Sequence, residues 1–111
     1  MDIDKELIGA STGVLVLSVL AKEASYGYQI IKRMNDEAEG LFTWQEGSLY
    51  PVLHKLEQEG LVRSQWQQAE TGRRRRYYYI TAKGRNALTA RAEQWGEFHQ
   101  LILRLTEASH G

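Results

Sequence analysis

Four consecutive arginines, Arg73 to Arg76, form the densest block of charge in this chain of 111 residues. The block continues to Lys83 and Arg85 with no acidic residue between positions 73 and 85, although the formal net charge of the chain is zero. A guanidinium stays charged and matches phosphate oxygens, so a local basic block favours contact with a polyanion. The alternative is a solvated strand edge whose charges discourage pairing between sheets.

The segment GSLYPVLHKLEQEGLV, residues 47–62, is the second place where residue type and spacing carry information. Its leucines recur at helical spacing, which predicts a helix that turns Leu49, Leu53 and Leu56 toward the core. With Ser48 as the N-cap, the proline of this segment lies in the first turn, where its missing N–H has no intrahelical partner to lose. The remaining circumference carries Ser48, Tyr50, Pro51, His54, Lys55 and Gln58. Such a mixed face suits a helix that enters the DNA major groove, and it also fits an ordinary solvated face.

Side chains suited to catalysis or metal binding are scattered. His54, His99 and His110 have no serine or carboxylate arranged with them as a triad. His54 and Glu57 are three residues apart, which is too few ligands for a metal and suits a surface ion pair better. Cysteine is absent, which excludes a disulfide framework and a thiolate metal site. We therefore expect no enzyme, no bound metal and no cofactor.

Hydrophobic periodicity predicts helices on both sides of these segments. A first helix is expected over residues 4–23 and a second over about 26–38, with Ser25 as a plausible N-cap. Thr81 is expected to cap a last helix over about 82–108, whose length exceeds what a small core can cover. Its apolar positions advance by threes and fours: Leu88, Ala92, Trp95, Phe98, Ile102 and Leu105.

A change of period from 3.6 to 2 after Gly60 predicts a β-hairpin. The strands are expected at residues 61–66 and 76–81, with Gly72 supplying a positive φ in the turn. Val62, Ser64 and Trp66 share one face of the first strand. The predicted fold is mainly α with a small β-hairpin: a winged helix-turn-helix over residues 1–81, followed by a long C-terminal dimerisation helix over residues 82–111.

Composition fits one ordinary globular chain, with 42% hydrophobic and 25% charged residues. The acidic N-terminus lacks the basic region of a signal peptide. The longest apolar run, residues 14–20, is far shorter than the ~20 residues that span a bilayer. We therefore expect a cytoplasmic protein with no membrane segment.

Three stretches resemble the PadR family of bacterial transcriptional regulators in order and spacing. They are YGYQIIKRM (26–34), GSLYPVLHKLEQEGLV (47–62) and GRRRRYYYITAKGR (72–85), and the resemblance spans about residues 12–95. It implies a homodimeric winged helix-turn-helix protein that binds palindromic promoter DNA, usually as a repressor that a ligand releases. The DNA contacts that it implies are Ser48, Tyr50, Pro51, His54 and Lys55 on the helix face, Arg73, Arg74 and Arg75 in the wing, and Tyr26 as a further candidate.

The sequence departs from the family pattern in three places. Tyr79 stands where the family often has a basic residue, which puts one phosphate contact in doubt. The loop KEAS, residues 22–25, lacks the proline or glycine common there. The single C-terminal helix resembles the short-tailed, multidrug-binding repressor type rather than members with a larger C-terminal domain.

Trp95 is the candidate for binding a small-molecule effector. If paired last helices and first helices form the dimer interface, Trp95 approaches its symmetry mate, and some short-tailed relatives resemble this arrangement and bind flat aromatic compounds between the tryptophans. Further expected lining residues are Val14, Ser18, Leu88 and His99. The alternative is that Trp95 only packs the dimer core. The alternative function for the whole chain is a winged-helix dimer that acts mainly as a small-molecule or protein-binding module.

Overall fold

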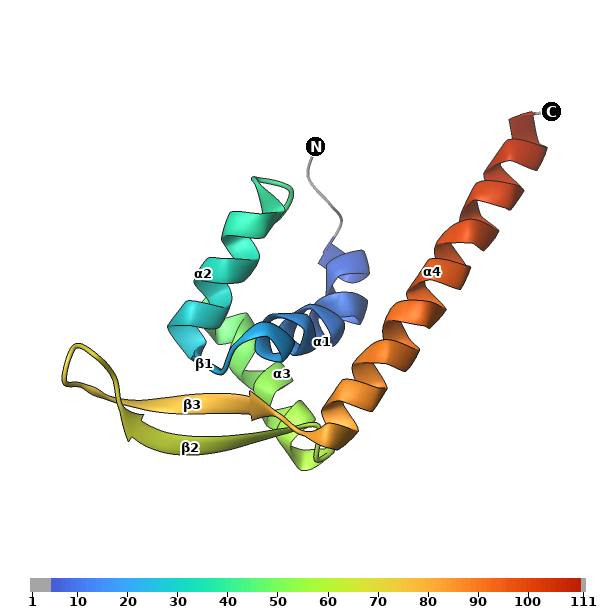
Figure 1. The fold of residues 1–111 in the computed structure, drawn as a ribbon. Helices are drawn as coiled ribbons and strands as arrows, with labels where there is room; N and C mark the ends of the chain where they lie inside the picture. The colour runs from blue at the N-terminus through green and yellow to red at the C-terminus, as the bar shows by residue number, and fades with distance from the viewer. Residues whose placement is uncertain (1–4, 111) are drawn as a thin grey trace.

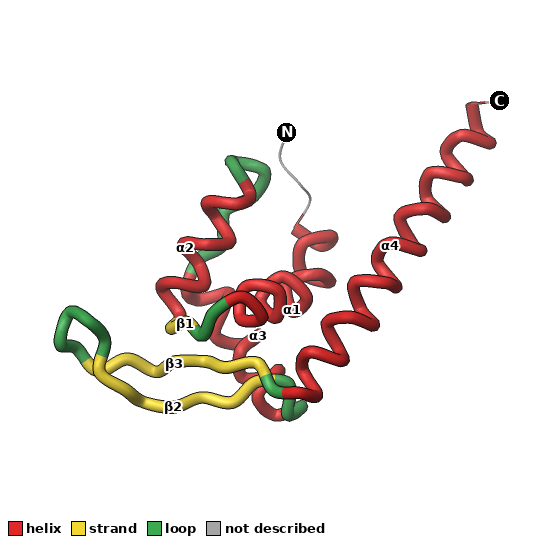
Figure 2. Tube along the Cα trace, viewed as in Figure 1, coloured by secondary structure: helices red, strands yellow, loops and turns green. Residues whose placement is uncertain are grey.

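A computed structural model describes residues 5–110. In this range the elements are α1 (Lys5–Lys22), β1 (Ser25–Tyr26), α2 (Gly27–Ala38), α3 (Glu46–Gln58), β2 (Val62–Gln68), β3 (Arg74–Ile80) and α4 (Ala82–His110). The first three helices cluster together, the β2–β3 hairpin projects from one side of the cluster, and α4 runs away from it as a long rod (Figure 1). The predicted element types and order are confirmed, and Figure 2 shows how little of the chain is loop. Residue 4, the predicted start of the first helix, lies outside the described residues.

The core forms where α1, α2 and α3 meet one face of the hairpin. Apolar side chains from every one of these elements are buried, and α3 contributes the leucines that its spacing predicted. The most deeply buried apolar side chains, each 0% exposed, are Val16, Leu17, Ile30, Leu49 and Leu53. Burial of such side chains stabilises a fold by about 1.5–3 kcal/mol each, so this core fixes the orientation of α3.

The sheet has a strand that the periodicity did not predict. Its order is β1-β3-β2, with both pairs antiparallel, and the short β1 places Ser25 opposite Tyr78. The prediction that Ser25 caps α2 is wrong, because α2 begins after Tyr26. The buried Ser25 hydroxyl instead donates to the Glu23 carbonyl oxygen at 3.0 Å and accepts from Arg33 Nη1 at 2.5 Å.

The hairpin has the predicted turn and extends further toward it than predicted. β2 and β3 pair from Val62 opposite Ile80 to Gln68 opposite Arg74. Gly72 has φ +87°, the left-handed conformation that glycine adopts without steric cost. The arginine block therefore lies at the turn and in the first residues of β3. We call the β2–β3 hairpin the wing.

The start of α3 differs from the prediction, and this changes the setting of Pro51. Gln45 is the N-cap and its carbonyl oxygen accepts from Ser48 N at 3.0 Å, so Ser48 lies inside the first turn and is not the cap. Pro51 is consequently in the helix interior and not in the first turn. Its missing N–H leaves the Gly47 carbonyl without the usual i→i−4 bond. Gly47 is exposed, so solvent can satisfy that carbonyl.

α4 is anchored at its start and exposed along its outer half. Gly84 N donates to Thr81 Oγ1 at 3.0 Å, which confirms the predicted cap. Gly84 also lies so close to the end of α3 that an added Cβ would collide with the Leu61 carbonyl oxygen and lie 2.8 Å from Cγ1 of Ile80. Beyond that junction the helix leaves the core (Figure 1). Within the described residues, no helix is both long enough and apolar enough to cross a membrane.

Candidate nucleic-acid interface

One face of α3 is exposed to solvent along the length of the helix. Leu49, Leu53 and Leu56 point inward with 0%, 0% and 2% exposure, as their spacing predicted. The side chains predicted to contact DNA from this helix are all exposed: Ser48, Tyr50, Pro51, His54 and Lys55. Burial of the leucines on one side of α3 thus keeps the hydrogen-bonding side chains on the opposite side exposed to solvent.

Tyr50 combines exposure with a packing contact. Its ring is 49% exposed, yet its hydroxyl oxygen lies only 3.0 Å from where a Cβ on Gly27 would be. A side chain larger than glycine at position 27 would therefore displace Tyr50 or the start of α2. Close approach of α2 and α3 at this point is the geometry of a helix-turn-helix pair.

The four arginines of the wing lie in different settings. Arg73 and Arg74 are exposed at the turn and at the start of β3. Arg75 is half-buried on the other face of the strand, with its guanidinium carbon 5.0 Å from the centroid of the Tyr26 ring. Its Nε is buried and has no hydrogen-bond partner among the described residues. Three of the four side chains, those of Arg73, Arg74 and Arg76, are thus exposed.

Arg76 belongs to a network that joins the wing to α3. Its Nε donates to Ser64 Oγ at 2.9 Å, and its Nη2 lies 3.2 Å from Glu57 Oε1. Ser64 Oγ in turn donates to Glu57 Oε2 at 2.6 Å. We call Glu57, Ser64 and Arg76 the Glu57 network. The predicted ion pair of Glu57 with His54 is wrong, because the partner of Glu57 is Arg76, which the strand register brings to it.

Tyr78 is a buried neighbour of Arg76, and both its burial and the Arg76 charge affect the pKa of its hydroxyl. Burial raises the pKa of the Tyr78 hydroxyl above its usual value, and the Arg76 guanidinium opposes that rise. The phenol therefore stays protonated at neutral pH.

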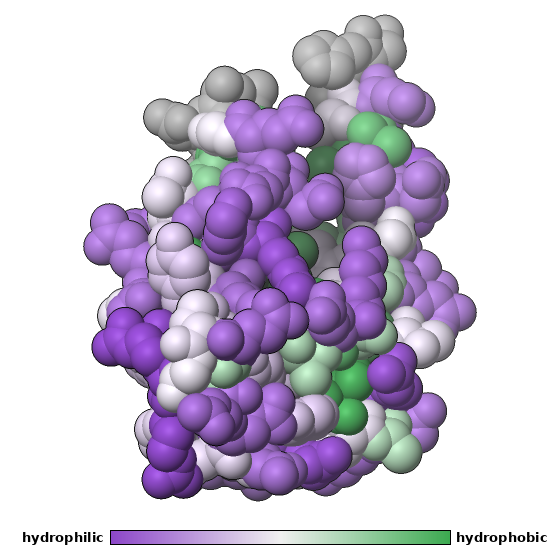
Figure 3. Space-filling view, turned by 60° about the vertical axis from the view of Figure 1, so that its left-hand side comes forward, coloured by the Kyte–Doolittle hydropathy of each residue, from purple (hydrophilic) through white to green (hydrophobic). Residues whose placement is uncertain are grey.

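Tyr26, the further DNA candidate, is part of an aromatic contact at the edge of the sheet. Its ring meets Tyr77 edge to face, with centroids 5.4 Å apart, and Arg75 covers it. Tyr26 is half-buried, so only part of the ring is open to a partner. Seen from the side of the wing tip, this face of the molecule is mostly hydrophilic (Figure 3).

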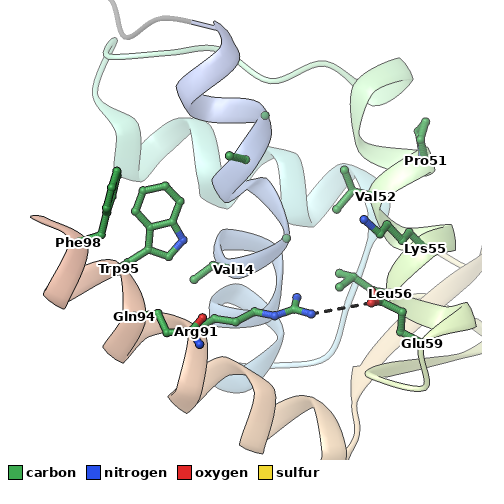
Figure 4. Close-up of a pocket in the computed structure, with 13 residues that line it drawn as sticks. Val14, Pro51, Val52, Lys55, Leu56, Glu59, Arg91, Gln94, Trp95 and Phe98 are labelled. Atoms are coloured by element: carbon green, nitrogen blue, oxygen red, sulfur yellow. Dashed lines mark ion pairs between the residues drawn. The ribbon is translucent and has the colours of Figure 1, made fainter.

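Three of the five residues predicted to bind a small molecule line two open grooves. One groove, of about 680 Å³, runs between α1, α3 and α4 and includes Val14 and Trp95 (Figure 4). The other, of about 740 Å³, runs along the opposite flank of α1 and includes Ser18 and Trp95. Leu88 and His99 line neither groove. The structure thus brings Trp95 together with Val14 and with Ser18, but on different sides of α1.

The first groove reaches α3. Lys55 of α3 and Glu59, its C-cap, face the groove, and Arg91 of α4 crosses it to within 3.9 Å of a Glu59 carboxylate oxygen (Figure 4). Trp95 meets Phe98 edge to face with ring centroids 6.0 Å apart. Among the described residues, no group of three or more His, Asp or Glu side chains is placed to hold a metal ion.

The Glu57 network and the exposed position of Trp66 were not predicted from the sequence. Contacts between residues 57, 64 and 76 depend on how the hairpin folds back on α3, which no local pattern encodes. Alternation places Trp66 on the same face of β2 as Val62 and Ser64. Trp66 lies further along the strand than the core extends, and this distance could have predicted its exposure. Its side chain is 56% exposed.

Comparison with known proteins gives a consistent result. A profile of the transcriptional regulator PadR-like family matches residues 16–90, which include all three motif stretches. The structure is similar to that of a transcriptional regulator from Clostridium thermocellum, with TM-score 0.83 and 30% identity over 92% of this chain and 96% of that one. It is also similar to a PadR-like transcriptional regulator from Bacillus cereus, with TM-score 0.80 and 27% identity over 91% and 96% of the two chains. A 43-residue stretch is 54% identical to the transcriptional regulator Rv3488 of Mycobacterium tuberculosis and covers 39% of each chain.

Proposed function

The chain belongs to the PadR-like family of DNA-binding transcriptional regulators, and we propose that it acts as a homodimeric repressor that a bound ligand releases from promoter DNA. One observation carries the proposal: two exposed surfaces suited to DNA are held by one core. His54 and Lys55 lie on the open face of α3, and Arg73 and Arg74 lie on the wing.

Each surface has a distinct task in this proposal. The exposed face of α3 enters the major groove, where Ser48, His54 and Lys55 supply hydrogen bonds to base edges. Tyr50 and Pro51 shape the same face. Arg73 and Arg74 bind phosphates and so fix the position of α3 along the duplex.

Arg75 and Tyr26 have supporting roles. The guanidinium of Arg75 lies over the Tyr26 ring at 5.0 Å, which holds both side chains at the edge of the sheet. Such a cation–π contact leaves the outer N–H groups of the guanidinium able to reach a phosphate. We assign these two residues to backbone contact at the rim of the interface.

Selection of bound duplexes from a random library tests the DNA assignment. We expect an enriched inverted repeat whose half-sites lie about one helical turn, ~10 base pairs, apart, because a two-fold symmetric dimer presents two copies of α3. Cells that carry a reporter behind this repeat should show lower expression when the protein is present. A library with no enriched motif, or a reporter that the protein leaves unchanged or activates, contradicts the proposal.

Exposed apolar side chains on α4 support the dimer. Phe98, Leu101 and Ile102 are 51%, 41% and 42% exposed, which is costly for an isolated chain. The groove of about 740 Å³ beside α1 has apolar side chains in its lining, Leu15 and Phe42 among them, together with charged side chains such as Lys22 and Glu37. The α4 helix of a second copy, laid along this groove, buries both surfaces. In this arrangement residues 1–81 bind DNA and residues 82–111 form the dimerisation helix.

Sedimentation of two charge variants tests the dimer. Ile102→Glu places a charge on the exposed apolar side of α4, whereas Gln100→Glu places the same charge on the polar side with Glu97 and Arg104. We expect the wild type and Gln100→Glu to sediment as dimers at micromolar concentration and Ile102→Glu to sediment as a monomer. A monomeric wild type, or a dimeric Ile102→Glu variant, contradicts this interface.

A planar aromatic effector is supported by the position of Trp95. Its indole borders both grooves beside α1, and a dimer brings two copies of it toward the symmetry axis. Stacking and apolar burial on an indole accept many flat ligands. Val14 and Ser18 then line the site from α1, and Leu88 and His99 contribute only if dimerisation rearranges α4.

Fluorescence quenching tests the effector site. A panel of planar cationic and phenolic aromatic compounds should quench the wild type and release it from the selected duplex. Trp95→Phe is the matched control. It keeps an aromatic ring at position 95 but removes the indole fluorophore, and it leaves Trp44 and Trp66 in place. Equal quenching of both proteins, or no quenching across the panel, contradicts the assignment of Trp95.

A further inference from the structure

Trp66 is an exposed tryptophan in the wing. It lies in β2 opposite Arg76 and is 56% exposed. The guanidinium carbon of Arg74 lies 5.8 Å from the centroid of its ring. Tryptophan and arginine are enriched at binding surfaces, so an exposed pair of the two is a candidate contact site.

The strand register fixes the direction in which Trp66 faces. Side chains two residues apart share a face, so Trp66 lies on the same face as Ser64, and Arg74 on the same face as Arg76. Ser64 and Arg76 both contact Glu57 of α3. Trp66 and Arg74 therefore lie on the face of the wing that is turned toward α3, about 7 Å further along each strand.

Other arginine–aromatic contacts of the wing differ from this pair. Arg76 lies over Tyr78, whose ring is buried, and Arg63 lies over Tyr79, which is half-buried and bonded to Gln67. In these contacts the ring already serves the fold. The Trp66 ring is the exposed one, so its contact with Arg74 leaves an apolar surface next to a cation that has no carboxylate partner among the described residues.

We infer that Trp66 and Arg74 form a DNA contact that packs on the sugar–phosphate backbone between α3 and the wing. This rests on the proposed function, and it adds a residue that the family motifs do not supply. The indole covers the apolar edge of a deoxyribose, and the guanidinium binds the adjacent phosphate. Charge favours this occupant over a protein, because the wing from Thr71 to Ile80 carries four arginines and no acidic residue.

Contact with the backbone is independent of base sequence, so a mixed-sequence duplex at low salt is a sufficient probe. We expect Trp66→Ala to weaken binding of this duplex by about 10-fold, the range of a lost aromatic stacking contact, with an unchanged salt dependence because no charge is removed. Trp66→Phe should lose less. Gln65→Ala is the matched control, since Gln65 is the exposed neighbour on the opposite face of the same strand.

The environment of Trp66 can be followed directly by fluorine NMR of protein labelled with 5-fluorotryptophan. The chain has three tryptophans, and the variants Trp66→Phe and Trp95→Phe assign their resonances. Saturation with the duplex should shift the Trp66 resonance and reduce its H₂O/D₂O isotope shift, which reports solvent exposure. The buried Trp44 should not change.

Two results overturn the inference: Trp66→Ala binds the duplex as tightly as Gln65→Ala, or the Trp66 resonance is unaffected at saturation. Either result leaves the proposed function intact if the wild type still selects an inverted repeat from the random duplex library. If the library instead yields no enriched repeat, the proposed function is contradicted, and the contact of Trp66 with the DNA backbone is not. If Trp66 changes on addition of a protein partner and not of DNA, the surface has a different occupant and the inference is wrong.

Discussion

Two sets of side chains on α3 contrast in how many contacts they make within the chain. Beside the wing, Glu57 is bonded to Ser64 and Arg76, and just beyond the helix Glu59 accepts a 2.9 Å hydrogen bond from Lys83 at its carbonyl oxygen. On the exposed face, the side chains of His54 and Lys55 have no hydrogen-bond or ion-pair partner among the described residues. The side chains beside the wing are held, and those on the exposed face are left open.

The wing repeats this contrast over four residues. Arg76 is held by Glu57, while Arg73 and Arg74 are exposed toward the turn. Charges that are already paired position an interface, and charges that are unpaired can bind a new partner. The difference teaches that residue type alone does not decide which arginines are available to the proposed DNA interface, since Arg76 is paired within the chain and Arg73 and Arg74 have no ion-pair partner among the described residues.

The largest effect is expected from two adjacent residues of α3, one in the core and one on the exposed face. Leu53→Ala should lower the free energy of unfolding by about 2–5 kcal/mol, because a fully buried leucine leaves a cavity. His54→Ala, on the exposed face, should change it by less than about 0.5 kcal/mol and weaken DNA binding instead. Urea unfolding at fixed protein concentration measures both. A strongly destabilised His54→Ala variant would show that the exposed face of α3 also serves the fold.

Two glycines of α4 give the next contrast. Gly84→Ala should destabilise by about 1–3 kcal/mol, because its Cβ would collide with the Leu61 carbonyl and the side chain of Ile80. Gly96→Ala meets nothing within 4 Å. It should stabilise by about 0.5–1 kcal/mol through the higher helix propensity of alanine. Melting temperatures that move in the same direction for both variants would contradict the close junction at Gly84.

A smaller effect is expected from the Glu57 network. Its side chains are 46% exposed at Arg76 and 30% at Glu57, so Arg76→Ala and Glu57→Gln should each cost at most about 1 kcal/mol of unfolding free energy. Because the two residues interact, the double variant should cost less than the sum of the single variants. Strictly additive losses in a double-mutant cycle would mean that the ion pair contributes nothing to holding the wing.

The fold could be predicted from the sequence because its signals are local. The leucine spacing in α3, the alternation in the hairpin, Gly72 in the turn and the Thr81 cap all act within a few residues. The two helix starts that were wrong, Ser25 and Ser48, are also local signals, but here they competed with longer-range structure. Ser25 pairs with β3 as part of β1, and its hydroxyl accepts a hydrogen bond from Arg33. The helix α3 begins after Gln45, three residues before the predicted cap Ser48.

The candidate interface was only partly predictable for the same reason. Exposure of His54 and Lys55 follows from the leucines on the opposite side of one helix. Which arginine of the block is held depends on a contact between positions 57 and 76, which are far apart in the chain. The strand β1, with Ser25 opposite Tyr78, was missed because two residues give no detectable periodicity.

The salt dependence of DNA affinity tests the central contrast most directly. Binding of the selected duplex should be measured over a series of salt concentrations for the wild type, for the double variant Arg73→Ala/Arg74→Ala, and for Arg76→Ala. We predict that the double variant lowers the magnitude of the log–log slope by about two, one for each lost phosphate contact, while Arg76→Ala leaves the slope unchanged. An unchanged slope in the double variant, or an equal reduction per arginine in Arg76→Ala, would contradict the division of the wing into held and open charges.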